Sequence, residues 1–215
     1  MSNDSILSQL CGRHPLLGTF KNIIGEAAEM IINCYSSGGK LLVCGNGGSC
    51  SDSEHIVGEL MKSFELSRPL KKEIVEKLSE AYGERGKYLA QKLESGLPAI
   101  SLSSQTALTT AICNDIDANL VFAQQVIGYG RDKDVLIAIS TSGNSQNVVD
   151  ACITAKAMNL KMIGLTGMTG GKMKQYCDIL VNVPEKRTAY VQELHLLVLH
   201  ALCLLIENHF YGNHK

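Results

Sequence analysis

Five short apolar segments constrain the fold of this chain more than any other feature of its sequence. Each is rich in β-branched or aliphatic residues, and each is separated from the next by a segment of helical character. Strands that are apolar on both faces form parallel sheets whose two faces are covered by helices. We therefore predict a five-stranded parallel sheet inside an α/β domain. The expected strands are KLLVC at 40–44, PAISL at 98–102, DVLIAIS at 134–140, KMIGLT at 161–166 and DILVNV at 178–183.

Helical segments alternate with these strands. Apolar residues recur at helical spacing over residues 17–37, and Gly38 and Gly39 end that helix. Such alternation is typical of a doubly wound, Rossmann- or flavodoxin-like three-layer sandwich, in which ligands bind beyond the carboxyl ends of the strands. We therefore expect a site in the loops after residues 44 and 140. The other expected helices lie at about 50–62, 104–113, 145–158 and 171–176, and from Tyr190 to about Phe210.

The segment 65–96 departs from this alternation and is rich in charge. Its leucines and Ile74 recur at rough helical intervals, which predicts an inserted helical hairpin broken near Gly83 to Gly86. We interpret it as a solvated excursion with one apolar face resting on the domain, and a lid or an oligomer contact is the alternative. The 215-residue chain then forms a single domain, 1–215, with this insertion inside it.

The composition argues against several classes of function. The chain carries 20 Lys and Arg against 21 Asp and Glu, without a long block of either sign, so a nucleic-acid partner held by bulk charge is not expected. The N-terminus lacks a secretory signal pattern, and no stretch approaches the roughly 20 apolar residues of a membrane span, so we expect a cytoplasmic protein without a membrane partner. Eight scattered cysteines without a CxxC pair are expected to be reduced thiols. Of these, Cys50 lies beside the first loop but lacks the pattern that activates a catalytic thiol.

The first loop, CGNGGSCSDSEH at residues 44–55, directly follows the first strand. Its glycines let the backbone come close to an oxyanion, and the N–H groups that open the next helix favour negative charge. Asn46 and Ser49 add hydrogen-bonding side chains. The pattern is neither GxGxxG nor a P-loop, which argues against a nucleotide cofactor. Phosphate binding or a mere tight turn would each explain this loop alone. Its glycines are Gly45, Gly47 and Gly48.

The second loop, ISTSGNSQN at residues 139–147, again follows an apolar strand and opens a helix. It gathers four hydroxyl groups on one turn without a Lys or Arg. Neutral donors at a helix N-terminus suit one phosphate monoester, which they bind through directional hydrogen bonds. A helix cap is the alternative, but one hydroxyl would satisfy a cap. The four hydroxyl residues are Ser140, Thr141, Ser142 and Ser145.

The two loops and the LTGMTGG turn at residues 165–171 together resemble the sugar isomerase (SIS) domain. Within that superfamily the chain is similar to the phosphoheptose isomerases over nearly all of residues 15–210, apart from the insertion. The resemblance implies a five-stranded parallel sheet and a homotetramer with active sites at subunit interfaces. It further implies an aldose–ketose isomerase that converts sedoheptulose 7-phosphate into D-glycero-D-manno-heptose 7-phosphate through an enediolate. By analogy alone, such a product would enter surface-polysaccharide synthesis.

The resemblance also assigns roles to four residues outside the loops. His55 and Glu59 lie four residues apart and hence on one face of the helix after the first loop. Gln192 and His200 match family positions on the C-terminal helix. In the family, the matching Glu and His form the acid–base pair. His55, Glu59, Gln192 and His200 together match the ligands of a zinc site in some members, with one Zn²⁺ per active site.

A further pair, Asn114 and Asp115, matches family residues that contact the sugar hydroxyls, although Asp115 could instead only cap a turn. His195, one turn before His200, is expected to be structural or interfacial. The full substrate-binding set that the resemblance implies is Asn46, Gly47, Gly48, Ser49, Glu59, Asn114, Asp115, Ser140, Thr141, Ser142, Ser145 and Gln192.

Isomerisation between C1 and C2 requires that a proton leave one carbon and return to the next through a cis-enediolate. A carboxylate of tuned pKa suits that transfer, and a second group must protonate or polarise the oxygen. We assign the carbon-proton transfer to Glu59 and the oxygen side to His200, and the reverse assignment stays open. Zinc, where bound, would polarise the carbonyl or stabilise the enediolate.

The sequence also raises difficulties for this assignment. Gln192 and His200 lie ~12 Å apart along a continuous helix, so both side chains must lean inward to share a metal. Short family members carry a basic residue soon after the helix Glu, where this chain has Lys62 and Ser63. An acidic residue three positions before the Gln is replaced by Ala189. Substrate identity and proton route are therefore less constrained than reaction class.

Two rival functions remain. One is a non-catalytic SIS protein that binds a replication-initiator protein, but that relative has Asn in place of the last His and Arg within the serine loop, where this chain has His200 and Ser142. The other is a different sugar-phosphate isomerase or sensor on the same domain, which the loops do not exclude.

Overall fold

The computed structural model describes residues 2–212 and contains a five-stranded sheet in which all neighbouring strands are parallel. The strand order is β2-β1-β3-β4-β5, which is the order of flavodoxin-like folds. This confirms the predicted α/β class and the parallel sheet. The strands are β1 (Leu41–Gly45), β2 (Ala99–Ser101), β3 (Val135–Ile139), β4 (Lys161–Thr166) and β5 (Ile179–Asn182).

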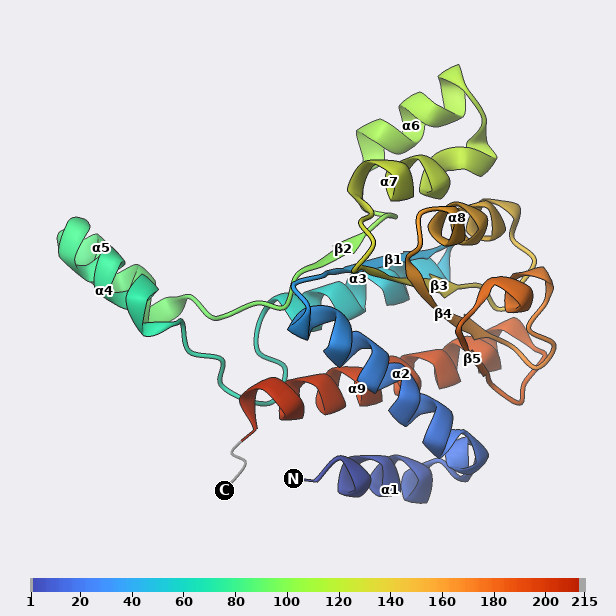
Figure 1. The fold of residues 1–215 in the computed structure, drawn as a ribbon. Helices are drawn as coiled ribbons and strands as arrows, with labels where there is room; N and C mark the ends of the chain where they lie inside the picture. The colour runs from blue at the N-terminus through green and yellow to red at the C-terminus, as the bar shows by residue number, and fades with distance from the viewer. Residues whose placement is uncertain (1, 213–215) are drawn as a thin grey trace.

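Helices cover both faces of the sheet, as Figure 1 shows. In β3, Val135, Ile137 and Ile139 belong to one core, whereas Leu136 and Ala138 belong to the other, as the alternation of side chains along a strand requires. The first core contains α1 (Asn3–Arg13), α2 (Lys21–Ser36), α3 (Gly48–Met61) and α9 (Thr188–Tyr211). The second contains α6 (Thr106–Asp115), α7 (Val121–Tyr129) and α8 (Gln146–Ala157). Three short 3-10 helices are η1 (Pro15–Phe20), η2 (Ala118–Leu120) and η3 (Lys172–Tyr176).

The expectation that no stretch approaches a membrane span is wrong by length and composition alone, because the last helix, α9, is long and apolar enough to cross a membrane. In the structure, however, Val198, Leu202 and Ile206 are fully buried in the same core as strands β1, β3 and β4. Helix α9 packs on both α2 and α3. It is therefore the central helix of this layer.

The insertion forms the predicted hairpin, with α4 (Lys72–Ala81) and α5 (Gly83–Lys92) on either side of a turn at Gly83. In Figure 1 the hairpin projects away from the sheet. Within the described helix α4 no residue is buried, and Ile74 and Leu93 are exposed. The expectation that one apolar face rests on the domain is therefore wrong. The two helices pack on each other instead, and Gly86 lies so close to the carbonyl of Leu78 that no side chain would fit there.

Candidate active site

Two loops meet at the carboxyl edge of the sheet because the strands that precede them, β1 and β3, are neighbours. We call residues 45–49 the GNGGS loop and residues 140–145 the serine loop. Asn46 and Asn147 join the two through a reciprocal pair of side-chain amide hydrogen bonds, of 2.8 and 2.9 Å. The loops that the sequence places 101 residues apart thus form one surface.

The serine loop is held in shape by the turn that follows β4. The backbone N–H of Gly167 donates to the carbonyl of Thr141 at 2.9 Å, and the side chain of Asn144 accepts from the N–H of Lys172 at 3.0 Å. Gly143 has a φ of 66°, and a Cβ there would collide with the carbonyl of Gly170. The loop conformation therefore requires glycine at position 143, and hydrogen bonds from the turn after β4 stabilise it.

The hydroxyl groups of the two loops differ in accessibility. Ser140 and Ser145 lie with their Oγ atoms 3.2 Å apart, and Ser142 is exposed. Ser49 is buried, although the exposed backbone of Gly47 and Gly48 leads into the first turn of α3. The expected anion site therefore consists of hydroxyls from the serine loop and backbone N–H groups at the start of α3.

A second group of polar side chains lies further along α3 and α9. The Nε2 atoms of His55 and His200 are 3.2 Å apart, and the Nε2 atom of His55 is 3.5 Å from the Oε1 atom of Glu59. Lys62 places its Nζ 3.2 Å from the other carboxylate oxygen of Glu59. Two imidazoles and one carboxylate that the sequence marked as candidates are thus in contact within one chain.

His200 lies in a partly apolar environment. The ring of Phe64 lies 5.6 Å from the His200 ring, between centroids and at an interplanar angle of 33°. Burial lowers the pKa of His200 below its ordinary value of 6.5, and the neighbouring His55 lowers it further, whereas Glu59 acts in the opposite direction. His200 is therefore neutral at pH 7, and a neutral imidazole can both donate and accept a hydrogen bond.

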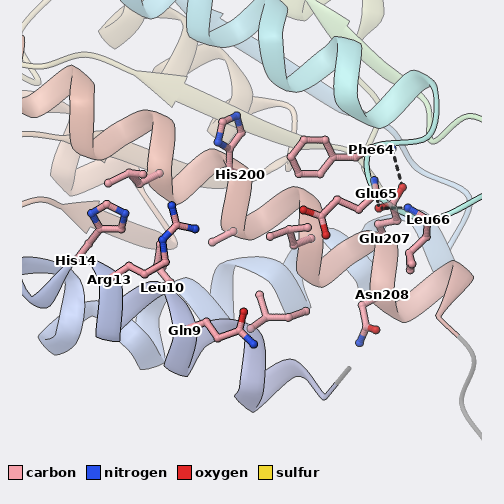
Figure 2. Close-up of a pocket in the computed structure, with 14 residues that line it drawn as sticks. Gln9, Leu10, Arg13, His14, Phe64, Glu65, Leu66, His200, Glu207 and Asn208 are labelled. Carbon is pink, nitrogen blue, oxygen red and sulfur yellow. Dashed lines mark hydrogen bonds between the residues drawn. The ribbon is translucent and has the colours of Figure 1, made fainter.

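A cavity of about 330 Å³ opens beside His200, between α1, α9 and the segment 64–66. Figure 2 shows Arg13, the last residue of α1, and the following His14 on one side of it, and Phe64 and His200 on the other. The cavity gives the imidazole space for a ligand.

Gln192 does not lie beside these three residues. Its side chain rests against the backbone of Gly48, at the first turn of α3. His200 is eight residues further along α9, which corresponds to about 12 Å of helix. Helices α3 and α9 lie side by side. Within one chain, Gln192 therefore lies near the GNGGS loop, at the start of α3, whereas His55, Glu59 and His200 lie further along the two helices.

The predicted sugar-contacting pair is also remote from this group. Asn114 and Asp115 are exposed at the end of α6, and the Asn114 amide donates to the Asp115 carboxylate at 2.8 Å. Helix α6 belongs to the layer on the opposite face of the sheet from α3 and α9. Among the residues that the structure describes, no hydrogen bond or ion pair joins this pair to His55, Glu59 or His200.

The donor atoms of the trio His55, Glu59 and His200, two imidazole nitrogens and one carboxylate oxygen, are of types that bind zinc. The Nε2 atom of His55 lies 3.2 Å from that of His200 and 3.5 Å from the Oε1 atom of Glu59. As they stand, however, these groups do not form a metal site, since among residues 2–212 no three His, Cys, Asp or Glu side chains are arranged so that they could hold a metal ion. The two imidazoles hydrogen-bond to each other instead, so a metal would have to replace that contact.

Several residues at the site carried no marked signal in the sequence. Asn147 and Phe64 fall in these contacts only because of the fold. Arg68 looked like one more charge in a solvated insertion, yet it is fully buried against Glu207. A signal did exist for Glu207, because it is an isolated acid in the apolar run LCLLIE of α9.

Comparisons with known proteins identify the family of the chain. The SIS domain family matches residues 16–96 and 78–167. A phosphoheptose isomerase of Laribacter hongkongensis is 36% identical over 213 residues, covering 98% of this chain and 95% of that protein. One of Helicobacter pylori is 39% identical over 194 residues, covering 90% and 88%.

The solved structure of phosphoheptose isomerase from Neisseria gonorrhoeae superposes with a TM-score of 0.73 at 34% identity, covering 91% of each chain. Sequence similarity over nearly the full length and similarity of fold thus both indicate the phosphoheptose isomerases. The chain belongs to the SIS domain family and, within it, to the phosphoheptose isomerases, which are enzymes.

Proposed function

We propose that the enzyme converts sedoheptulose 7-phosphate into D-glycero-D-manno-heptose 7-phosphate. The relatives named above are phosphoheptose isomerases, which supports a heptose phosphate as substrate. The observation that carries the proposal is the contact of His55 and Glu59, on the helix α3 that begins at the GNGGS loop, with His200 on the neighbouring helix α9. One end of the site offers hydroxyl and backbone donors for a phosphate, and the other offers acid–base groups for the sugar carbons.

Glu59 transfers the proton between C1 and C2 in this proposal. Its carboxylate is only partly exposed, and Lys62 and His55 contact its two oxygens. A carboxylate on one face of the planar cis-enediolate can reach both carbons, so it can take a proton from one and return it to the other.

His200 acts on the oxygen side. Because its pKa is below 6.5, the imidazole is neutral at pH 7 and can donate one proton to the developing enediolate oxygen while it accepts from a hydroxyl. His55 contacts its Nε2 atom and orients the ring. Zinc bound by His55, Glu59 and His200 would polarise the carbonyl, and Gln192 would join these ligands only if its side chain leaned toward them.

The active enzyme is a cytoplasmic homotetramer with interfacial sites in this proposal. Asn114 and Asp115 are on the opposite face of the sheet from His200, and only a second subunit could bring them to it. This separation supports sites shared between subunits.

The test is turnover by purified protein. We expect conversion of sedoheptulose 7-phosphate, with little or no turnover of fructose 6-phosphate or pentose 5-phosphates. Glu59→Gln and His200→Asn should each lower kcat by at least about 100-fold, since general acid–base groups contribute about 10²–10⁴. Glu29→Gln, an exposed carboxylate on α2, is the matched control and should retain full turnover.

Assays on metal-stripped protein, with and without added Zn²⁺, test the role of zinc. Full turnover by either active-site variant would overturn the residue assignment. Binding of the sugar phosphate without turnover by wild-type protein would instead support the sensor alternative.

A further inference from the structure

A buried ion pair, Arg68 with Glu207, lies close to the helices that carry Glu59 and His200. The Nε atom of Arg68 donates to an oxygen of Glu207 at 2.7 Å, and the two side chains are 0% and 1% exposed. Arg68 lies at the start of the inserted segment and Glu207 near the end of α9. Neither residue had a role in the resemblance or in the proposed chemistry.

Arg68 holds the end of the helix that carries Glu59. Its two remaining guanidinium nitrogens donate to the carbonyls of Leu60 at 2.7 Å and Glu59 at 3.0 Å. The last carbonyls of a helix lack partners within that helix, and a cation there is favourable. Because one of these carbonyls belongs to Glu59 itself, Arg68 fixes the backbone from which the carboxylate projects.

Glu207 holds the segment that contacts His200. Its carboxylate accepts three consecutive backbone N–H groups, from Phe64, Glu65 and Leu66, at 2.8, 2.8 and 3.0 Å. Figure 2 shows Glu207 next to Glu65 and Leu66, with Phe64 between this group and His200. Burial alone would raise the pKa of Glu207, but the three N–H groups and Arg68 outweigh it and lower the pKa. Since the ring of Phe64 lies against His200, Glu207 fixes one wall around the imidazole.

We propose that Arg68 and Glu207 are positioning residues, which together set the distance and orientation between Glu59 and His200. Arg68 binds the end of α3, and Glu207 belongs to α9. The bond between their side chains therefore links the two helices that carry Glu59 and His200. The proposal rests on the proposed function, in which those two groups act on adjacent atoms of one sugar. Displacement of a catalytic group by about 1 Å costs on the order of 100-fold in rate.

The test separates positioning from folding by means of a neutral replacement. Glu207→Gln alone leaves the charge of Arg68 buried without a counter-ion, which destabilises the fold. The double variant Arg68→Met with Glu207→Gln removes that charge and keeps one amide oxygen, which can accept from the N–H groups of Glu65 and Leu66 as the corresponding carboxylate oxygen does. We expect the double variant to melt close to wild type, with kcat lowered by about 10- to 100-fold and KM changed by less than about threefold.

Asp134→Asn is the matched control. Asp134 is also buried, pairs with Lys40 at 2.6 Å and accepts the N–H groups of Lys40 and Arg131, but it precedes β3 at the edge of the sheet opposite to the site. It should lower the melting temperature without lowering kcat. Wild-type kcat in the folded double variant would overturn the proposal.

A second readout does not depend on turnover. In protein labelled with ¹³C at histidine, the imidazole signals of His200 report the position of the Phe64 ring. They should move in the double variant and stay unchanged in Asp134→Asn. Unmoved signals would refute the positioning role even if wild type proved inactive on heptose phosphates, whereas moved signals with an inactive wild type would count only against the proposed substrate.

Discussion

At the scale of single residues, two glycines differ sharply in what a methyl group would meet. At Gly143, with a φ of 66°, a Cβ would collide with the backbone of Gly170 in the turn that braces the serine loop. At Gly128 in α7, a Cβ would meet nothing within 4 Å. The same substitution should therefore have opposite effects at the two positions.

Gly143→Ala should weaken phosphate binding by about tenfold, or about 1.4 kcal/mol, because the serine loop must shift. Competitive inhibition by inorganic phosphate measures this change. Gly128→Ala should leave the inhibition constant unchanged and should raise the free energy of unfolding by about 0.5–1 kcal/mol, since alanine is favoured in helices. Equal inhibition constants for the two variants would show that the serine loop does not bind the phosphate.

His195 provides a prediction about pH. It is fully buried, and burial lowers its pKa from 6.5 to about 4, although a contact with the backbone of Thr166 acts in the opposite direction. Between those values the unfolded chain binds a proton that the folded protein does not. Stability contributed by this group is therefore complete above pH 6.5 and is lost as the pH falls toward 4.

We expect wild-type protein to lose about 2 kcal/mol between pH 7 and pH 5 through this group. His195→Leu should remove that part of the loss, because leucine does not titrate. Melting curves at both pH values and at one protein concentration measure the difference. If the two proteins lose the same stability on acidification, His195 is not the group responsible.

The sequence anticipates the residues of the site better than their arrangement. His55 and Glu59 share a helix face because of their spacing, and the contact with His200 follows once α3 and α9 pack side by side. The position of Gln192 against Gly48 depends on the register between those helices, which no local pattern encodes. The burial of Arg68 likewise depends on a partner 139 residues away.

At the scale of elements, the periodicity of apolar residues predicted the helices that have a clear apolar stripe. It missed two helices that lack one. Helix α1 is mixed in polarity, and α7, with the sequence VFAQQVIGY, is apolar nearly all round, so neither presents a clear stripe. The hairpin was predicted as helical because its stripe is clear. The same stripe did not reveal that α4 and α5 pack on each other, since a pattern does not specify what an apolar face contacts.

We expect that the hairpin can be removed without unfolding the domain, because the two chain segments at its base are bonded to each other. Pro69 and Glu94 pair in an antiparallel bridge, the N–H of Ser95 donates to the carbonyl of Arg68 at 2.8 Å, and Glu94 accepts from the N–H of Ser63 at 2.9 Å. Replacement of residues 70–93 by Asn-Gly, which favours a two-residue hairpin turn, would keep this base intact.

We expect the shortened protein to fold, with a change in unfolding free energy below about 1 kcal/mol and hence a melting temperature within about 4 °C of wild type. Circular dichroism melts measure it. Tyr82→Asn, which places Asn-Gly at the tip of the intact hairpin, is the control. A shortened protein that folds but no longer assembles would identify the hairpin as a subunit contact, contrary to this expectation.

At the scale of the whole molecule, the candidate site is divided among parts that one chain does not bring together. The GNGGS loop and the serine loop lie at the carboxyl edge of the sheet. His55, Glu59 and His200 lie on one face of the sheet, and Asn114 and Asp115 lie on the other. The same outer layer, α6 to α8, exposes several large apolar side chains. These are Leu108, Ile116, Ile127 and Ile153.

Apolar side chains gathered on one face are typical of a contact with another protein, and symmetric contacts between identical chains are the commonest kind. Ile116 is 63% exposed beside Asp115, and Ile127 is 54% exposed on α7. If this face binds a second subunit, Asn114 and Asp115 lie at the same contact and can reach a site that the partner offers. Assembly and catalysis should then be lost together.

Light scattering coupled to size-exclusion chromatography tests this link. Wild type should have a mass of four times 23.3 kDa. Ile116→Glu with Ile127→Glu should yield smaller species with an unchanged circular dichroism spectrum and kcat lowered at least about 100-fold, because each site loses groups that only another chain supplies. Ile74→Glu, at an apolar residue 45% exposed on the hairpin, should change neither mass nor kcat. A dissociated chain that retained full turnover would mean that His55, Glu59 and His200 suffice with the loops of their own subunit.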